Sequence, residues 1–399
     1  MEFPDLIQQR DKIIEAFSRE EGGSVDNIGV IASPYRICPL GAHIDHQGGS
    51  VLGMTINAFT LMAFYPSNDG DVKLRSKNYP GNVSFNLSDI TESSGSFWGV
   101  YPRAAALSMQ EKYNIRRGVV GILDGMLPGC GLSSSASVLL AYLHAFARVN
   151  SIEIEPWEYV ELTHKAENKY IGLNNGILDQ TSIVFGKRDY LLHINTRDKE
   201  VTHLADRISE GGYRILVAFS GYSRELTTQG YNSRVDECRM AADQISRMAG
   251  SDPAKILSDV PLSDYQRYKQ SLEPHLEKRC SHFFSESQCV SDGVVAWKNN
   301  GIEEFGKLMN KSCQSSMEKY ECGIQAIYDL QQIVSSEKGV MGSRFMGGGF
   351  GGCVVGFVRP DHAADAVVNI RTTYEKLHPE SVGQASVHLA HSGDGVRFI

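Results

Sequence analysis

Two blocks of different secondary structure follow one another along this chain of 399 residues, and they meet at Ser209-Glu210-Gly211-Gly212. Strand-like runs dominate as far as Leu123 and two helical patterns follow, whereas helical patterns dominate after the break. The predicted strands are 28–33, 51–64, 190–195, 213–219, 353–358 and 384–391, and the predicted helices are 132–149, 156–171, 233–248, 276–298, 325–335 and 361–377. This mixture predicts an α+β fold rather than a doubly wound sheet, with domains at 1–209 and 210–399.

Charge and composition narrow the classes of partner. The formal net charge is −8 and lysines and arginines are nowhere concentrated, which argues against a nucleic-acid or membrane-surface partner. No run of about 18 apolar residues is present and the first residues lack the basic start of a secretory signal, so a cytoplasmic protein is expected. The eight cysteines form no Cys-x-x-Cys motif, which predicts reduced thiols. Because the net charge is negative, any attraction for phosphate must come from local features, such as helix ends, a few arginines or a metal ion.

A glycine-rich turn leads directly into an apolar helix at 128–136. Free backbone N–H groups and the positive helix end face such a turn, so it predicts an anion site. Serine hydroxyls there can donate to phosphate oxygens or bind a magnesium ion. The alternative is that Ser133 only caps the helix and that the other serines have no binding role. The candidate phosphate-binding residues are Gly129, Gly131, Leu132, Ser133, Ser134, Ser135 and Ala136.

A second glycine cluster, 347–352, formally contains Gly-x-Gly-x-x-Gly. A dinucleotide-binding fingerprint must open a helix, whereas an apolar strand-like run follows here and Pro360 closes it. We therefore expect that the glycines of 347–352, which have no side chains, let the backbone pass close to a ligand or to another loop.

A polar segment, residues 36 to 49, connects the first two predicted strands. It carries Arg36, His43 and Asp45 but only a methyl group at Ala42. Polar residues on such a connection commonly serve binding, although His43 and Asp45 could equally serve the turn backbone. A metal shared by His43 and His46 is disfavoured because no third ligand lies nearby in sequence.

Two acidic residues are candidates for chemistry. Asp179 stands between apolar neighbours, so we expect it to be partly buried and to need a cationic partner, for which Arg36 is the candidate. Capping of a helix by Asp179 is the alternative. Glu167 lies on a predicted helix that ends at Gly172, where an ordinary solvated position is the local expectation.

Four segments in this order resemble the galactose, homoserine, mevalonate and phosphomevalonate (GHMP) kinase superfamily, and within it the galactokinase branch. The segments are 34–45, 131–136, 176–180 and 346–353, and the resemblance covers nearly the whole chain. It implies a GHMP kinase fold, with an N-terminal half like the second domain of ribosomal protein S5, a ferredoxin-like C-terminal half and ATP bound between them.

The resemblance also implies roles for the candidates. Asp179 would take the proton of the anomeric hydroxyl, and Arg36 would keep Asp179 ionised and stabilise the phosphoryl charge. Mg²⁺ would be held by Ser135 and Glu167. Further positions implied are Ala42, His43, Asp45, His46, Gly176 and Tyr231 around the sugar, and Trp98, Tyr101 and Gly348 near the nucleotide.

One departure from the galactokinase pattern concerns Ala42, where that branch carries a Glu that binds the 6-hydroxyl of the sugar. A retained Glu would repel a carboxylate at C6 by about 4 kcal/mol at 4 Å and an effective dielectric near 20, roughly a thousandfold in binding. His43 and His46 could instead donate to that acid. The pattern thus resembles the galacturonokinase branch and predicts phosphorylation of galacturonate. A galactokinase, or a sugar- and ATP-binding sensor without turnover, remains an alternative.

Overall fold

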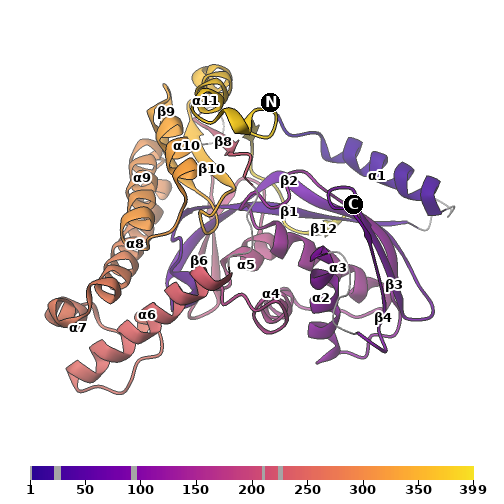
Figure 1. Cartoon of the computed structure of the whole chain (residues 1–399), viewed down its shortest axis with the longest axis horizontal. Coiled ribbons are helices and arrows are strands. Elements are labelled where there is room, and N and C mark those ends of the chain that lie inside the picture. Colours follow the sequence, from indigo (N-terminus) through magenta and orange to yellow (C-terminus); the bar gives the residue numbers. More distant parts are fainter. Residues whose placement is uncertain (1, 22–27, 91–96, 209–211, 223–227) are drawn as a thin grey trace.

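The computed structural model describes residues 2–21, 28–90, 97–208, 212–222 and 228–399. It contains two β-sheets, each accompanied by helices (Figure 1). Residues 209–211 of the predicted domain boundary lie outside the described residues, so the division at that point stays a prediction. Within the described ranges, none of the helices combines the length and the apolar character that a membrane-spanning segment requires.

The first sheet is built mainly from the N-terminal half. Its order is β12-β1-β2-β5-β3-β4, with β6 beside β2 and β7 beside β6, and every pair is antiparallel except β3 with β5. The strands are β1 Gly29–Leu40, β2 Ser50–Pro66, β3 Asp71–Ser76, β4 Asn82–Asn86, β5 Val119–Gly125, β6 Tyr190–Asn195, β7 Glu200–Ala205 and β12 Arg397–Phe398. The last strand thus returns the C-terminal end of the chain to this sheet.

Helices cover both faces of the first sheet, which explains why its central strands β1 and β2 are buried along almost their whole length. On one face, Ile13 and Phe17 of helix α1 (Leu6–Glu21) pack against Val30 and Ala32. On the other face, Ile31 and its neighbours pack against further helices. These are α2 Val100–Gln110, α3 Ser134–Val149, α4 Pro156–Lys165 and α5 Leu178–Phe185, which lie below the sheet in Figure 1.

The second sheet has the antiparallel order β11-β8-β10-β9. Its strands are β8 Arg214–Phe219, β9 Val340–Phe345, β10 Cys353–Val358 and β11 Ser386–Ala390. The helices of this half are α6 Thr228–Ala249, α7 Leu262–Tyr268, α8 Pro274–Lys298, α9 Ile302–Glu318, α10 Gln325–Ser336 and α11 Ala363–Leu377. One hydrophobic cluster joins the two halves, because Ile37 and Leu52 of the first sheet belong to the same core as Leu216 and Val355 of the second.

Two local expectations differ from the structure. The segment from Arg36 to Leu40, expected to be part of a turn, continues β1, because its pairing with β2 outweighs the local turn signals; register shifts after Pro34 and after Ile37 absorb the irregularity. The helix expected at 156–171 ends as an α-helix at Lys165 and continues as a π-helical turn over Ala166–Ile171.

Candidate active site

Two cavities meet at the glycine-rich turn. Gly131, Ser133 and Ser135 line both of them. The first cavity, of about 680 Å³, is lined also by four of the candidate sugar residues, Ala42, His43, Asp45 and Tyr231, and the second, of about 1300 Å³, by aromatic side chains. A phosphate group bound at the turn would therefore be reached from both sides.

Arg36 and Asp179 form the predicted ion pair. Nε and Nη2 of Arg36 lie 2.9 and 2.8 Å from Oδ1 of Asp179, and the guanidinium is almost fully buried. Arg36 also donates its backbone N–H to the carbonyl of Leu132 (3.1 Å) and Nη1 to that of Gly131 (3.3 Å). The pair is thus fixed against the glycine-rich turn, with Asp179 in the first turn of α5 and facing the first cavity.

Asp45 supports the beginning of α5. Its Oδ2 accepts the backbone N–H of Leu178 (3.1 Å), and a Cβ at Gly176 would lie 2.3 Å from the same oxygen, so only glycine fits there. Burial, together with the like charge of Asp179, raises the pKa of Asp45 from 3.8 to about 6. Asp45 faces the first cavity, whereas Gly176 lies behind it, on a different cavity.

Ala42 and His43 line the first cavity, as does Tyr231 of α6. His43 has a positive φ of 62° and its ring stacks on Tyr320, with centroids 4.6 Å apart. Its Nε2 lies 3.3 Å from Sγ of Cys322. Ala42 therefore borders the cavity beside the imidazole of His43 and the ring of Tyr231.

His46 does not line the first cavity, contrary to the expectation that it would face the sugar with His43. Its Nε2 lies 2.9 Å from the hydroxyl of Tyr320, and its Nδ1 accepts a hydrogen bond from the side chain of Gln47 (2.9 Å). His46 instead lines a different cavity, together with Gly176, and its ring meets that of Tyr231 edge-on with centroids 6.0 Å apart. Burial lowers the pKa of His46 to about 3, so the ring is neutral near pH 7.

The glycine-rich turn is held by the second glycine cluster. A Cβ at Gly131 would lie 2.9 Å from the carbonyl oxygen of Met346, and one at Gly352 would lie 2.6 Å from that of Cys130. The expectation of backbone passing close to another loop is therefore confirmed. Gly348, expected near the nucleotide, lines the first cavity and not the second. Leu132 and Ala136, two of the candidate phosphate ligands, are fully buried core residues and line neither cavity.

The serines of the turn differ in their surroundings. Ser134 accepts the backbone N–H of Gly129 (3.0 Å) at its Oγ. Ser133 has a left-handed backbone (φ 63°) and its buried Oγ has no hydrogen-bond partner among the described residues. An unsatisfied buried donor at the junction of two cavities is typical of a ligand site rather than of a simple helix cap.

Ser135 and Glu167 lie together, as a shared metal ligand role requires. The Oγ of Ser135 donates to Oε1 of Glu167 at 3.4 Å, and Glu167 is buried rather than solvated, with Oε2 accepting from Asn175 (2.8 Å). Among the described residues, no group of three or more His, Cys, Asp or Glu side chains could hold a metal ion. A hydroxyl and one carboxylate nevertheless suit Mg²⁺, which takes its remaining ligands from phosphates and water.

Aromatic residues form the second cavity. Trp98 and Tyr101 line it together with Tyr79, Tyr142 and the side of the glycine-rich turn. Trp98 is almost fully buried and donates its Nε1–H to the carbonyl of Pro80 (3.2 Å). A largely apolar, aromatic-lined cavity next to an anion site fits a nucleotide base.

Sequence reasoning missed four residues behind Ala42: His282, Glu286, Ser312 and Arg344. They are buried, and they contact the backbone at residues 41 and 42 or one another. One signal was present, because an imidazole and a carboxylate one turn apart stand within the predicted helix 276–298.

Three family models match the chain: the GHMP kinases N terminal domain at residues 100–187, the GHMP kinases C terminal domain at 294–376 and the galactokinase galactose-binding signature at 15–66. A galacturonokinase of Arabidopsis thaliana is 39% identical over 98% of both chains. The chain belongs to the GHMP kinase family, whose members use ATP as the phosphate donor. The predicted family and α+β fold are thus confirmed.

Within this family the chain is similar to galactokinases as well. One from Clostridium perfringens is 31% identical over 91% of this chain and 93% of its own. The crystal structure of Lactococcus lactis galactokinase complexed with galactose matches with a TM-score of 0.87 at 27% identity, covering 96% of this chain and 98% of that one. A mevalonate kinase structure, at 15% identity and a TM-score of 0.63, shares the fold.

Proposed function

We propose that this protein transfers the γ-phosphoryl group of ATP to the anomeric hydroxyl of galacturonate. The observation that carries the proposal is that Ala42 lines the first cavity, so residue 42 brings no side-chain carboxylate there to oppose an acidic C6 group. The similarity over 98% of the chain to a galacturonokinase supports it.

Asp179 is the proposed general base. It accepts the proton of the anomeric hydroxyl as that oxygen forms a bond to the γ-phosphorus and the bond from phosphorus to the oxygen of the leaving ADP breaks. Arg36 forms an ion pair with the carboxylate of Asp179 and lies beside the glycine-rich turn, where it balances charge on the transferred group. Mg²⁺, held by Ser135 and Glu167, would neutralise phosphate charge.

The remaining lining residues orient the sugar. With the anomeric end at Asp179, the sugar ring extends toward Asp45 and Tyr231, and its C6 group toward Ala42 and His43. The nucleotide base occupies the cavity of Trp98 on the other side of the turn. This arrangement brings the acceptor oxygen and the γ-phosphate together at Ser133 and Ser135, which line both cavities.

The experiment is a paired assay with Mg²⁺ and ATP, in which ADP release is followed with galacturonate and with galactose as acceptor. We expect a higher kcat/KM for galacturonate. A higher kcat/KM for galactose would favour the second candidate, a galactokinase, which the similarity to galactokinases supports. ATP and sugar binding without any turnover would favour a sensor. The division into domains 1–209 and 210–399 likewise stays a proposal, which limited proteolysis can test.

A further inference from the structure

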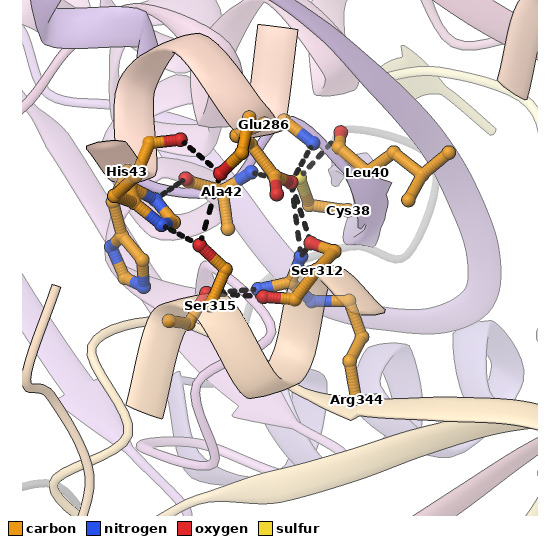
Figure 2. A network of polar contacts seen from close by, with 12 residues as sticks. Cys38, Leu40, Ala42, His43, Glu286, Ser312, Ser315 and Arg344 are labelled. Carbon is orange, nitrogen blue, oxygen red and sulfur yellow. Dashed lines mark hydrogen bonds and ion pairs between the residues drawn. The ribbon is translucent and has the colours of Figure 1, made fainter. Parts of the chain in front are cut away.

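A buried charge network lies behind Ala42 and comes entirely from the C-terminal half of the chain (Figure 2). Glu286 of α8, Ser312 of α9 and Arg344 of β9 are each at most 1% exposed. A carboxylate and a guanidinium removed so completely from water are costly unless they compensate each other and their surroundings. Because Arg344 also lines the first cavity, the arrangement of these charges matters for what that cavity can bind.

The hydrogen bonds and the ion pair of the Glu286 carboxylate all involve one of its two oxygens, Oε1. Its Oε1 accepts the backbone N–H of Gly41 (2.6 Å), that of Ala42 (3.2 Å) and the hydroxyl of Ser312 (2.5 Å), and it lies 3.6 Å from Nη1 of Arg344. Its Oε2 has no hydrogen-bond partner among the described residues. Because the backbone of Ala42 and the guanidinium of Arg344 approach the same oxygen atom, Arg344 lies at the Ala42 end of the cavity.

His282, one turn earlier on α8, holds the other side of the same peptide. Its Nε2 lies 2.9 Å from the carbonyl oxygen of Ala42, which can only accept, so Nε2 carries the proton. Its Nδ1 then accepts from the hydroxyl of Ser315 (2.9 Å), and burial keeps the ring neutral by lowering its pKa. Residue 42 is thus fixed through both its N–H and its C=O by one face of α8 (Figure 2).

Two of the described residues that line the first cavity, Arg36 and Arg344, carry a fixed positive charge. Arg36 directs Nε and Nη2 to Asp179, at the reacting end of the cavity. Arg344 donates to the hydroxyl of Ser312 through Nη1, to that of Ser316 through Nη2 (3.4 Å) and to the carbonyl of Phe345 through Nε (3.3 Å), whereas its distance to Glu286 exceeds a hydrogen bond. A guanidinium has five N–H donors, so these three hydrogen bonds leave donors for a further acceptor.

We propose that Arg344 is the cation that recognises the carboxylate of the sugar acid, while Glu286 neutralises Arg344 in the free protein and holds the Ala42 wall in place. This inference rests on the proposed function and adds the residue that gives the acid an advantage over a neutral sugar. When the acid binds at the Ala42 end, its carboxylate adds to Glu286 as a second partner of Arg344. A neutral C6 group offers the guanidinium no such charge.

The test compares the binding of galacturonate with that of galacturonamide, a neutral ligand of nearly the same shape, by calorimetry. The double variant Arg344→Met/Glu286→Gln removes both charges together, so neither is left alone in the interior, and the amide introduced by Glu286→Gln keeps an oxygen for the N–H groups of residues 41 and 42. Losing the partner of a buried charge commonly costs about thirtyfold or more in affinity. For the double variant we expect a loss of this size in the affinity for galacturonate, and a change of less than about threefold in the affinity for galacturonamide.

Two further variants separate charge from positioning. Glu286→Gln alone keeps Arg344 and removes its competitor, so it should raise the preference for the acid over the amide. Arg371→Met, on the exposed part of α11, is the matched surface control and should change neither affinity. Melting temperatures establish that each variant is folded.

The outcomes distinguish this inference from the proposed function. If the wild type uses galactose better than galacturonate, the proposed function fails. If the wild type prefers galacturonate and the double variant keeps that preference over the amide, only the role of Arg344 is overturned. Should the double variant not fold, a crystal structure of the wild type with galacturonate decides: a sugar carboxylate beyond salt-bridge distance from the Arg344 guanidinium would contradict the inference.

Discussion

Replacing Ala42 by Glu restores a carboxylate at the wall of the sugar cavity. Ala42 is 8% exposed, lines this cavity, and has its backbone nitrogen 3.2 Å from Oε1 of Glu286. A new carboxylate there would meet both the acid group of the substrate and the buried charge of Glu286. We therefore expect Ala42→Glu to impair the use of galacturonate selectively.

The expected size follows from electrostatics. Two like charges about 4 Å apart at an effective dielectric near 20 repel by about 4 kcal/mol, which corresponds to roughly a thousandfold. Arg344 is close enough to Glu286 (3.6 Å) to offset part of this repulsion. A loss of about a hundredfold to a thousandfold in kcat/KM for galacturonate is therefore expected, with little change for galactose, whose 6-hydroxyl can donate to the new carboxylate.

Ala42→Gln is the matched control, because glutamine has the shape of glutamate without its charge. The assay measures kcat/KM with galacturonate and galactose for the wild type and both variants, at saturating Mg²⁺ and ATP. Equal losses of kcat/KM for galacturonate in the Glu and Gln variants would mean that the larger side chain, and not its charge, impairs the use of the acid. Unchanged selectivity in both would show that C6 lies elsewhere, and the choice of an acidic sugar would lose its physical basis.

Three other residues carry predictions. Asp179→Asn should lower kcat by about a hundredfold to ten-thousandfold with a small change in the KM for sugar, measured by ADP release, because the proton acceptor is lost while the cavity remains. Glu167→Gln should raise the Mg²⁺ concentration needed for half-maximal rate, with a smaller effect on the maximal rate, and an unchanged Mg²⁺ titration would remove Glu167 from the metal site. Since the folded-state pKa of Asp45 is raised to about 6, its ionised form is lost below that pH, and kcat/KM should fall there with a limb that Asp45→Asn abolishes. The folded state also holds this proton more tightly than the unfolded chain, so the stability of the wild type relative to Asp45→Asn should decrease as pH rises from about 4 to about 6 and change no further above that.

Two short apolar strands were predicted with the bounds that the structure has, whereas the buried strand β9 was not predicted. The ranges 190–195 and 353–358 coincide with β6 and β10, because short apolar runs bounded by turn signals have few other ways to be buried. The helix Ile302–Glu318 was missed, although its buried face is clear in the structure, since serines occupy part of that face. The strand through Arg36 to Leu40 was also missed, because a long-range partner strand formed it against its local composition.

The sequence by itself determined the residue types of the site: an arginine and an aspartate that must pair once buried, glycines that let two backbones approach, and a methyl group where an anion would exclude an acid. These follow from properties that each residue carries into any fold. The tertiary structure alone decided which cavity His46 lines, and it brought Glu286 to the backbone of Gly41 from 245 positions away. Such contacts depend on how α8, α9 and β9 pack against the N-terminal sheet, and packing between distant segments leaves no local pattern in the chain.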